Sequence, residues 1–127
     1  MKLFSNSRIT TTGALAEQRA CSFLKNHGMK LITQNYRYRG GEIDLIMSDG
    51  ETTVFIEVKC RKDVSHGHPF ENIDHRKQQK LTRTAEHFCL SRFKSTCVNM
   101  RFDGFAIIGD PNAKTAQMEW LKNIIIL

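Results

Sequence analysis

The sequence predicts an α/β fold in which helices pack on a mixed β-sheet. Two segments have apolar residues at helical spacing, residues 13–27 and 72–93. The other apolar runs are short and rich in β-branched and aromatic residues, as strands are: 30–38, 42–47, 53–61, 100–108 and 117–126. The order helix, three strands, helix, two strands is typical of an α/β sandwich around a mixed sheet. The 127 residues are expected to form one domain over 1–127, with 1–11 as a loose N-terminal arm.

The first helix is expected over residues 13–27, with a cap at Thr11 or Thr12 and an end at Gly28. At 100° per residue, its inward stripe consists of Ala14, Ala20, Cys21 and Leu24. Glu17 falls inside this stripe. A glutamate on a buried helix face either pairs with a nearby arginine or joins another polar cluster, and the sequence leaves both options open.

The strand expected over 30–38 ends in alternating aromatic and basic residues. Tyr36 and Tyr38 alternate with Arg37 and Arg39. Such side chains can stack on nucleic-acid bases and lie along phosphates. The alternative is an exposed edge strand in which the aromatic rings pack against the arginines.

A hairpin is expected between the strands 42–47 and 53–61. Asp49 and Gly50 form an Asp-Gly pair, which is typical of a two-residue turn. This turn pairs Asp44 with Phe55 and Glu42 with Glu57. Because side chains alternate with period two, Glu42, Asp44, Phe55, Glu57 and Lys59 then share one face.

Three ionised residues, Asp44, Glu57 and Lys59, interrupt these two apolar strands. An unpaired buried charge costs several kcal/mol, on the order of the net stability of a domain, so the three predict a site that uses them. In the expected register Asp44 and Glu57 are diagonal neighbours, with Cα atoms roughly 7–8 Å apart, and one cation can bridge their carboxylates. A turn of odd length without a bulge would instead place them on opposite faces. Taken alone, a Glu-x-Lys pattern in a strand more often marks a solvated face.

The second half of the chain supplies a loop, a helix and two strands. Residues 62–69 form a loop beside the expected site. The helix over 72–93 has an apolar stripe at Ile73, Leu81, Ala85, Phe88 and Cys89. The strands 100–108 and 117–126 follow, separated by a turn near Pro111.

Two motifs carry a resemblance to a known family. Gly-Glu-Ile-Asp-Leu at 41–45 followed by Glu-Val-Lys at 57–59 is similar to the bacterial YraN family, whose motif places it beside the PD-(D/E)XK nucleases. That group contains the restriction-endonuclease-like and Holliday-junction-resolvase-like enzymes. Weaker matching residues are Gly13, Glu17, Ala20, Asn35, Tyr36, Arg37, Arg61, Lys77, Leu81, Ala85, Arg101, Phe102 and Asp103. The resemblance runs from about Gly13 to the C-terminus, and Ile43 stands where the nucleases carry proline, which shapes the strand and holds no metal.

The resemblance implies a restriction-endonuclease-like sandwich and a role for each acid residue. Asp44 and Glu57 would be metal ligands, Lys59 the catalytic lysine and Glu17 the supporting acid from the helix. Oxygen ligands favour Mg²⁺ or Mn²⁺ as the cofactor. The implied reaction is metal-assisted hydrolysis of a phosphodiester, in which Lys59 orients water or stabilises the developing negative charge.

Composition and charge narrow the expected partners. The net charge of +6 and the pI of about 9.4 suggest a polyanion, with DNA as the expected nucleic acid. The residues expected to hold its phosphate backbone are Arg37, Arg39, Arg61 and Lys77. No apolar stretch is long enough to cross a membrane, and the first residues lack a signal peptide's apolar core. A cytoplasmic protein without a membrane partner is therefore expected, and a homodimer is left possible.

The cysteines indicate neither a disulfide frame nor a standard zinc site. Cys21, Cys60, Cys89 and Cys97 form no Cys-x-x-Cys pair and are expected to be reduced. The segment His66-Gly67-His68 near Cys60 suggests zinc only weakly, because the spacing matches no standard site.

Two functions of different classes remain open. The first is a metal-dependent, endonuclease-like hydrolase of DNA, including branched or structured DNA. The second is a nucleic-acid-binding module with the same fold and no cleavage activity. A third reading is a polar core network in a protein of unrelated function. The set of Asp44, Glu57 and Lys59 favours the nuclease, since a pure binder has no use for a costly pair of acids in its core.

Overall fold

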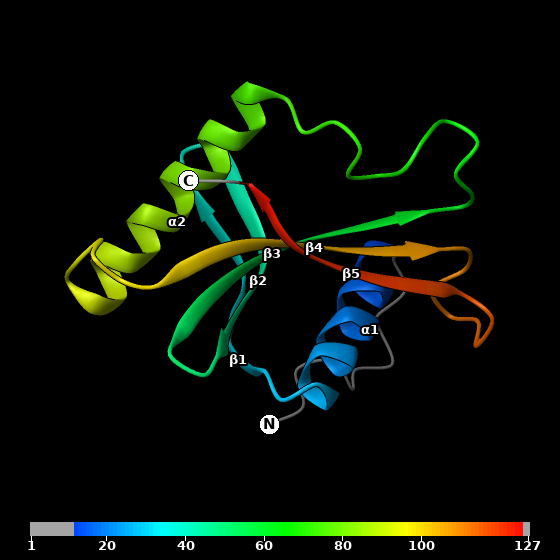
Figure 1. Cartoon of the computed structure of the whole chain (residues 1–127), viewed down its shortest axis with the longest axis horizontal. Coiled ribbons are helices and arrows are strands. Elements are labelled where there is room, and N and C mark those ends of the chain that lie inside the picture. Colours follow the sequence, from blue (N-terminus) through cyan, green and yellow to red (C-terminus); the bar gives the residue numbers. More distant parts are fainter. Residues whose placement is uncertain (1–11, 126–127) are drawn as a thin grey trace.

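The computed structural model describes residues 12–125, which form two helices and five strands (Figure 1). The elements are α1 (Thr12–Asn26), β1 (Lys30–Tyr38), β2 (Gly41–Asp49), β3 (Thr52–Arg61), α2 (His75–Phe93), β4 (Met100–Ile108) and β5 (Gln117–Ile125). This is the predicted order, and the α/β class is confirmed. The expected arm at 1–11, which includes the Thr11 cap, lies outside the described residues.

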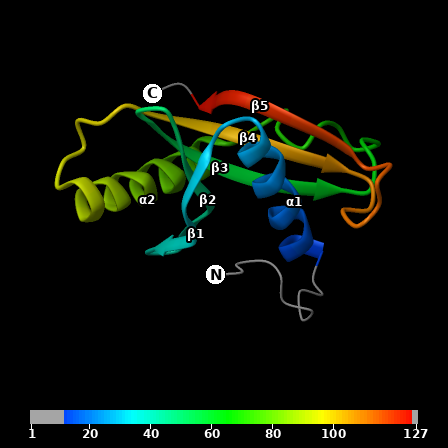
Figure 2. The ribbon, with the colours of Figure 1, turned by 90° about the horizontal axis from the view of Figure 1, so that it is seen from below.

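The sheet is mixed, as predicted. Its strand order is β1-β2-β3-β4-β5, and all neighbours are antiparallel except β3 and β4, which are parallel. Parallel neighbours need a crossover connection, and α2 supplies it. Figures 1 and 2 show α1 and α2 on opposite sides of the twisted strands.

Each helix covers its own hydrophobic cluster. Ala16, Ala20, Cys21 and Leu24 of α1 pack against Leu45, Met47, Val54, Ile56, Phe105 and Ile107. Leu81, Ala85, Phe88 and Cys89 of α2 pack against Ile43, Ile46, Phe55, Phe102 and Ile125 on the other face. The stripe predicted for α1 was wrong at one position: Ala16 is buried, whereas Ala14 is half-buried. The helix therefore buries the row spaced by four residues through Ala16, Ala20 and Leu24.

The hairpin register predicted from the Asp-Gly pair is wrong by two residues. Asp49 pairs with Thr52, so Gly50 and Glu51 are the turn residues. Gly50 takes the first turn position with a φ of 61°, a conformation that suits glycine. Asp49 stays in the strand, where its carboxylate accepts a hydrogen bond of 2.9 Å from Arg101 Nη2. A shift of two residues preserves the face of every side chain in a regular strand, so Phe55, Glu57 and Lys59 of β3 keep their predicted common face. The prediction fails for Glu42, because Gly41 and Ile43 on either side of it face α2.

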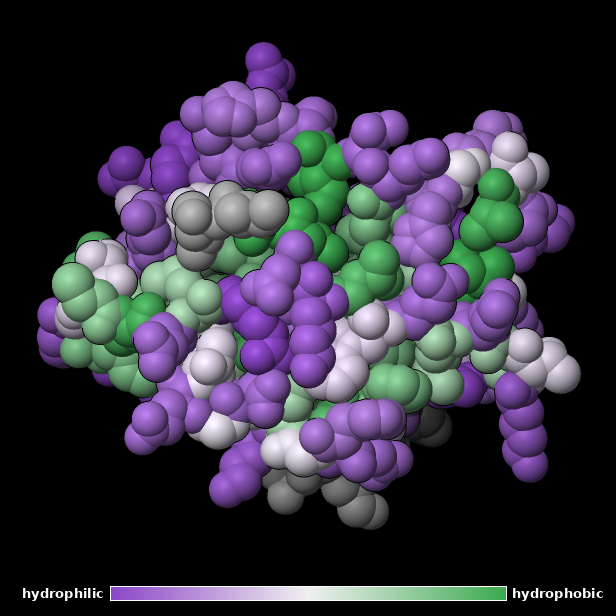
Figure 3. Space-filling view, viewed as in Figure 1, coloured by the Kyte–Doolittle hydropathy of each residue, from purple (hydrophilic) through white to green (hydrophobic). Residues whose placement is uncertain are grey.

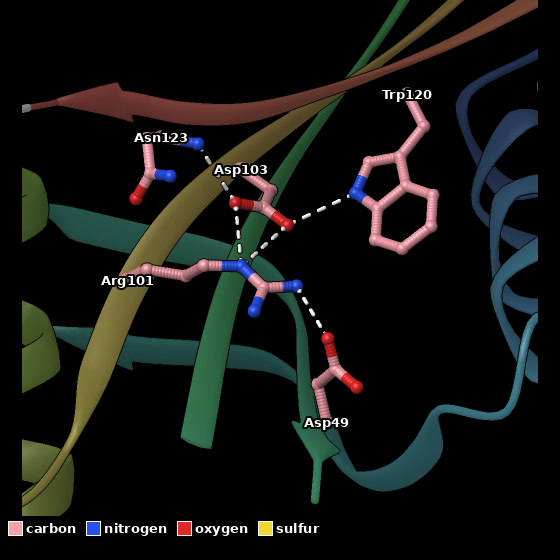
Figure 4. A network of polar contacts seen from close by, with 5 residues as sticks. All are labelled: Asp49, Arg101, Asp103, Trp120 and Asn123. Carbon is pink, nitrogen blue, oxygen red and sulfur yellow. Dashed lines mark hydrogen bonds and ion pairs between the residues drawn. The ribbon is translucent and has the colours of Figure 1, made fainter.

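A buried carboxylate and its arginine partner join three strands, β2, β4 and β5 (Figure 4). Asp103 of β4 is 0% exposed. Its two oxygens accept hydrogen bonds from Arg101 Nε at 3.1 Å, Trp120 Nε1 at 2.9 Å and the Asn123 backbone N–H at 3.0 Å. Arg101 also pairs with Asp49, so the network joins the β2–β3 hairpin to β4 and β5. Fully satisfied polar networks of this kind rigidify a core, and this one fixes β2, β4 and β5 relative to one another.

The contact between the start of β2 and α2 leads to a stability prediction. A Cβ at Gly41 would overlap the Thr84 hydroxyl and lie 3.1 Å from the Lys80 carbonyl oxygen. Gly41→Ala should therefore push β2 from α2 and lower the free energy of unfolding by about 1–3 kcal/mol. Denaturant unfolding measures the change. In the control Gly13→Ala the new methyl group meets nothing within 4 Å, and stability should be unchanged or higher. Equal stability of both variants would contradict the tight packing.

Candidate active site at the β2–β3 fork

Two neighbouring strands separate at the residues that carry the acids. The β2–β3 ladder ends at the pair of Leu45 and Ile56, whereas β3 stays paired with β4 as far as Arg61. Beyond the last pair, the Val58 backbone N–H donates to Asp44 Oδ2 at 2.8 Å. A carboxylate thus takes the place of a backbone carbonyl and satisfies a donor that the fork would leave unpaired. In Figure 1, β1 and β2 rise beside α2 while β3 and β4 continue together to the right.

The strand β2 loses its regular alternation at the same point. Ile43 and Ile46 are three residues apart, yet both belong to the cluster under α2. Opposite this stretch, Asn35 of β1 takes a left-handed φ of 51°. The local twist lets Asp44 meet side chains from both sides of the sheet.

Three carboxylates adjoin one another along this fork. Asp44 interacts electrostatically and by side-chain hydrogen bonds with Glu57 and Glu17. The Asn35 amide donates to Glu17 Oε1 at 3.0 Å. Burial, and next the charge of Glu57, raise the pKa of the Asp44 carboxyl from 3.8 to about 8. Burial also raises the pKa of Glu17, which the hydrogen bond from Asn35 partly offsets. The cluster is therefore short of positive charge.

A cation from α2 forms an ion pair with this cluster. Lys77 Nζ lies 2.8 Å from Glu57 Oε2, with side-chain exposures of 44% and 13%. Lys77 is expected from the sequence to hold the phosphate backbone, whereas in the structure its ammonium is paired with Glu57, the proposed metal ligand. Within residues 12–125, no group of three or more His, Cys, Asp or Glu side chains is arranged so that it could hold a metal ion. Mg²⁺ is commonly held by one or two carboxylates and several waters, and Asp44 with Glu57 fits that requirement.

Lys59 lies on the same strand as Glu57, two residues further on, and is held by the loop before α2. Its Nζ donates to the Pro69 carbonyl at 3.1 Å and lies 4.9 Å from the centre of the Phe70 ring. The Phe70 ring packs directly over Gly104, where an added Cβ would come within 3.0 Å of it. Burial, and next the charge of Lys77, lower the pKa of the Lys59 ammonium. This loop therefore fixes the lysine beside the acids.

An open cleft of about 390 Å³ lies above the acids, between the fork and the start of α2. It is lined by Gly40, Gly41, Glu42, Asp44, Glu57, Asp74, Arg76, Lys77, Lys80 and Leu81. The helix is positioned by Asp74, whose side chain caps it by accepting a hydrogen bond from Lys77 N at 2.8 Å. Because Arg76 and Lys80 are four residues apart, they stand on one side of the helix beside Lys77. Figure 3 shows hydrophilic side chains gathered over this end of α2.

The other basic residues predicted for nucleic-acid binding have separate surroundings. Arg37 pairs with Glu42 at 3.1 Å. The Arg39 guanidinium lies 5.3 Å from the centre of the Tyr38 ring. Arg61 is exposed at the end of β3, where it donates to the Cys60 carbonyl at 2.9 Å. None of these three lines the cleft that holds the acids.

The two tyrosines of β1 pack on α2. The Tyr36 hydroxyl and His87 Nδ1 share a hydrogen bond of 2.6 Å, and the Tyr38 ring stacks on His87 with centroids 3.8 Å apart. This is the aromatic packing of an edge strand, and its partner, His87, carries no signal in the sequence of β1. Arg83, one turn before His87, was also missed. Its spacing of three from Lys80 is a helical signal that could have placed it on the same side.

The histidine and cysteine residues considered for zinc do not meet. His68 Nε2 lies 3.1 Å from Glu119 Oε2, and Cys60 Sγ donates instead to the Gly109 carbonyl at 3.6 Å. The four cysteines are free thiols, and Cys21 and Cys89 are buried as predicted. In the part of the chain that the structure describes, no helix has the length and apolarity needed to cross a membrane.

The family model and the similar proteins found by comparison all name the same family. The family described as "Uncharacterised protein family UPF0102" matches residues 16–107. A UPF0102 protein of Chromohalobacter salexigens is 42% identical over 119 residues, which cover 94% of each chain. One from Psychromonas ingrahamii is 43% identical over 120 residues, covering 94% of this chain and 89% of that protein. A UPF0102 protein of Vibrio cholerae is 40% identical over 124 residues, covering 97% of each.

The raised pKa of Asp44 predicts how stability depends on pH in metal-free buffer. The folded protein keeps this proton up to about pH 8, whereas the unfolded chain releases it near the ordinary value of 3.8. Between these values the unfolded state binds fewer protons, so the free energy of unfolding should fall as pH rises, by about 1 kcal/mol per pH unit. Asp44→Asn removes the titrating group, and the variant should be more stable than wild type at pH 7.5.

Denaturant unfolding across the pH range measures this slope. Glu51→Gln is the matched control, because Glu51 is exposed in the turn of the same hairpin. It should leave the slope as it is in wild type. A wild-type protein whose stability rises between pH 5 and pH 8, with no difference in Asp44→Asn, would contradict the crowding of acids at the fork.

Proposed function

The chain belongs to the UPF0102 (YraN) family, and we propose that it is a metal-dependent nuclease that hydrolyses phosphodiester bonds of DNA. The observation that carries the proposal is the placement of Asp44 beside Glu57 at a strand fork, with Lys59 on the same face and a cleft above them. Such an arrangement is costly for folding, which favours a functional reason for it.

The acids and the cleft fit a hard divalent cation. Asp44 and Glu57 would hold Mg²⁺ or Mn²⁺, and the bound cation would supply Lewis acidity toward a phosphoryl oxygen and a water of lowered pKa. Asp44 Oδ2 accepts the Val58 N–H, and a bound cation would replace the hydrogen bonds that Asp44 makes with Glu57 and Glu17. Without any metal, Glu57 already attracts a cation, because it forms an ion pair with Lys77. Glu17 adjoins Asp44 and would support it from the side of α1.

The lysines would act on the phosphate. Lys59 lies on the face of β3 that carries Glu57, and the Pro69 carbonyl and the Phe70 ring hold its ammonium in place. A preorganised cation of this kind stabilises negative charge that develops in a transition state. Arg76 and Lys80 line the cleft from α2 and would hold the flanking backbone.

A nucleic-acid-binding module without cleavage activity is the second candidate. The favouring observations are the net charge of +6 and the basic side of α2, which would suffice for binding. A binding module would not need the carboxylates of Asp44 and Glu57 at the fork. The two candidates differ in what Lys59 does.

The test of cleavage uses Lys59→Ala. With Mg²⁺ or Mn²⁺, wild type should cut at least one of duplex, single-stranded and branched DNA, and the variant should be slower by roughly a hundredfold to a thousandfold. Its metal affinity should stay near that of wild type, because Lys59 is not a ligand. Lys114→Ala, an exposed lysine in the turn before β5, is the control and should cleave normally.

Two results would contradict the proposal. A folded Lys59→Ala protein with wild-type turnover would mean that the lysine is misassigned. A wild type that binds these DNAs and cuts none of them would favour the binding module.

The ion pair between Lys77 and Glu57 predicts competition with the metal. Lys77→Ala removes the ammonium that occupies Glu57, so affinity for Mn²⁺ in the absence of DNA should rise by roughly twofold to fivefold, the worth of a partly exposed pair. Lys80→Ala removes a cleft charge that is not paired with Glu57, and its effect should be smaller. Calorimetric titration compares them. Weaker Mn²⁺ binding in Lys77→Ala would place the metal away from Glu57.

A further inference from the structure

A second cavity, of about 260 Å³, adjoins the cleft along α2. It is lined by Tyr38, Arg39, Lys80, Arg83, Glu86, His87 and Leu90. Lys80 lines both cavities, and Arg39 of this one precedes Gly40 of the cleft. The two cavities are thus neighbours on one surface, and a chain that crosses the acids can reach both.

One wall of this cavity is a fixed aromatic pair. The rings of Tyr38 and His87 are 3.8 Å apart and 11° from parallel. Tyr36 holds His87 through its hydroxyl and packs edge-on against the buried Phe88, with centroids 5.2 Å apart. The pair is therefore anchored to the core and offers a rigid aromatic surface, of the kind on which nucleobases stack.

The remaining lining is mainly cationic. Arg39, Lys80 and Arg83 contribute three positive charges against the single carboxylate of Glu86. Among residues 12–125, no salt bridge joins any of these three cations to a carboxylate, in contrast to Arg37 and Lys77. Their charge is available to an anion.

The backbone conformation at Arg39 is unfavourable for arginine. It has a φ of 44° and is followed by Gly40 with a φ of 81°, as in a type I′ hairpin turn. Asparagine or glycine is favoured at the first position of this turn, because a larger side chain is strained there. The guanidinium of Arg39 lies over the Tyr38 ring. Strain of this kind often accompanies a function of the side chain.

We propose that this cavity binds one unstacked nucleotide of a nucleic-acid strand. The Arg39 guanidinium leaves the Tyr38 ring for the phosphate, which Lys80 and Arg83 also hold, and the base then stacks against the Tyr38–His87 pair. The proposal rests on the proposed function in one respect, that the same strand continues over the acids. Its consequence is a preference for substrates with an unpaired nucleotide beside the scissile bond, since a base inside a duplex cannot enter the cavity.

The first experiment measures binding alone, with EDTA present and no metal. Thymidine 5′-monophosphate, thymidine and inorganic phosphate are titrated separately into the whole protein, and NMR follows the Tyr38 and His87 ring signals. The nucleotide should bind more tightly than either fragment and shift both rings. Phosphate that binds as tightly as the nucleotide would reduce the cavity to an anion site and overturn the proposal. Ring signals that do not move would overturn it as well.

The second experiment uses variants with opposite effects on folding and binding. Arg39→Asn suits the turn better, so its unfolding temperature should stay the same or rise, while affinity for a short single-stranded oligothymidine should fall by roughly fivefold. Tyr38→Leu should lose roughly tenfold through the missing stack. Arg92→Gln, an exposed arginine in the last turn of α2, is the control and should bind as wild type does. Unchanged affinity in folded Arg39→Asn would overturn the proposal even if Tyr38→Leu folds poorly.

The two proposals fail separately. A protein that binds the nucleotide at Tyr38 in EDTA and cuts nothing with Mg²⁺ or Mn²⁺ keeps this inference and loses the nuclease. A protein that cuts DNA equally well in wild type and Tyr38→Leu keeps the nuclease and loses this inference.

Discussion

The hydrogen bond from the Val58 N–H to the Asp44 carboxylate is the interaction on which the site depends. Strands that part in the middle of a sheet leave backbone groups without partners, and a buried orphan donor costs roughly 1–3 kcal/mol. Asp44 supplies the missing acceptor at 2.8 Å, so β2 can leave β3 while β3 remains in the sheet with β4. The fork opens the cleft and places Glu57 beside Asp44. One side chain thereby serves the fold and the proposed chemistry.

The electrostatics around the fork show the cost of that arrangement. Asp44 lies between two other carboxylates, and burial with their charge raises its pKa to about 8. The chain offsets this with Lys77 from α2, which the crossover between β3 and β4 brings over the acids. Asp103 pairs with Ile56 at the last residue before the fork, and its hydrogen-bond network is fully satisfied. A carboxylate whose hydrogen bonds are complete therefore lies next to the fork, where Asp44 and Glu57 crowd together.

Much of the fold could be predicted from sequence because its signals are periodic. The element order, the mixed sheet and the common face of Glu57 and Lys59 follow from spacing alone. The hairpin register could not be obtained in this way, since a tertiary contact from Arg101 keeps Asp49 in the strand and overrides the local preference of Asp-Gly. The pairing of Lys77 with Glu57, and the role of His87 under the tyrosines, depend on where α2 crosses the sheet. Sequence spacing within one element carries no such information.

The central claim is that Asp44 and Glu57 together form the seat of a divalent cation. Anomalous diffraction from crystals of the whole protein soaked in Mn²⁺ tests it most directly. The account predicts an anomalous peak within ligand distance, about 2.0–2.3 Å, of oxygens from both carboxylates, with Lys77 Nζ withdrawn from Glu57. A peak bound elsewhere, or an empty fork at saturating Mn²⁺ with the Lys77–Glu57 pair intact, would contradict it.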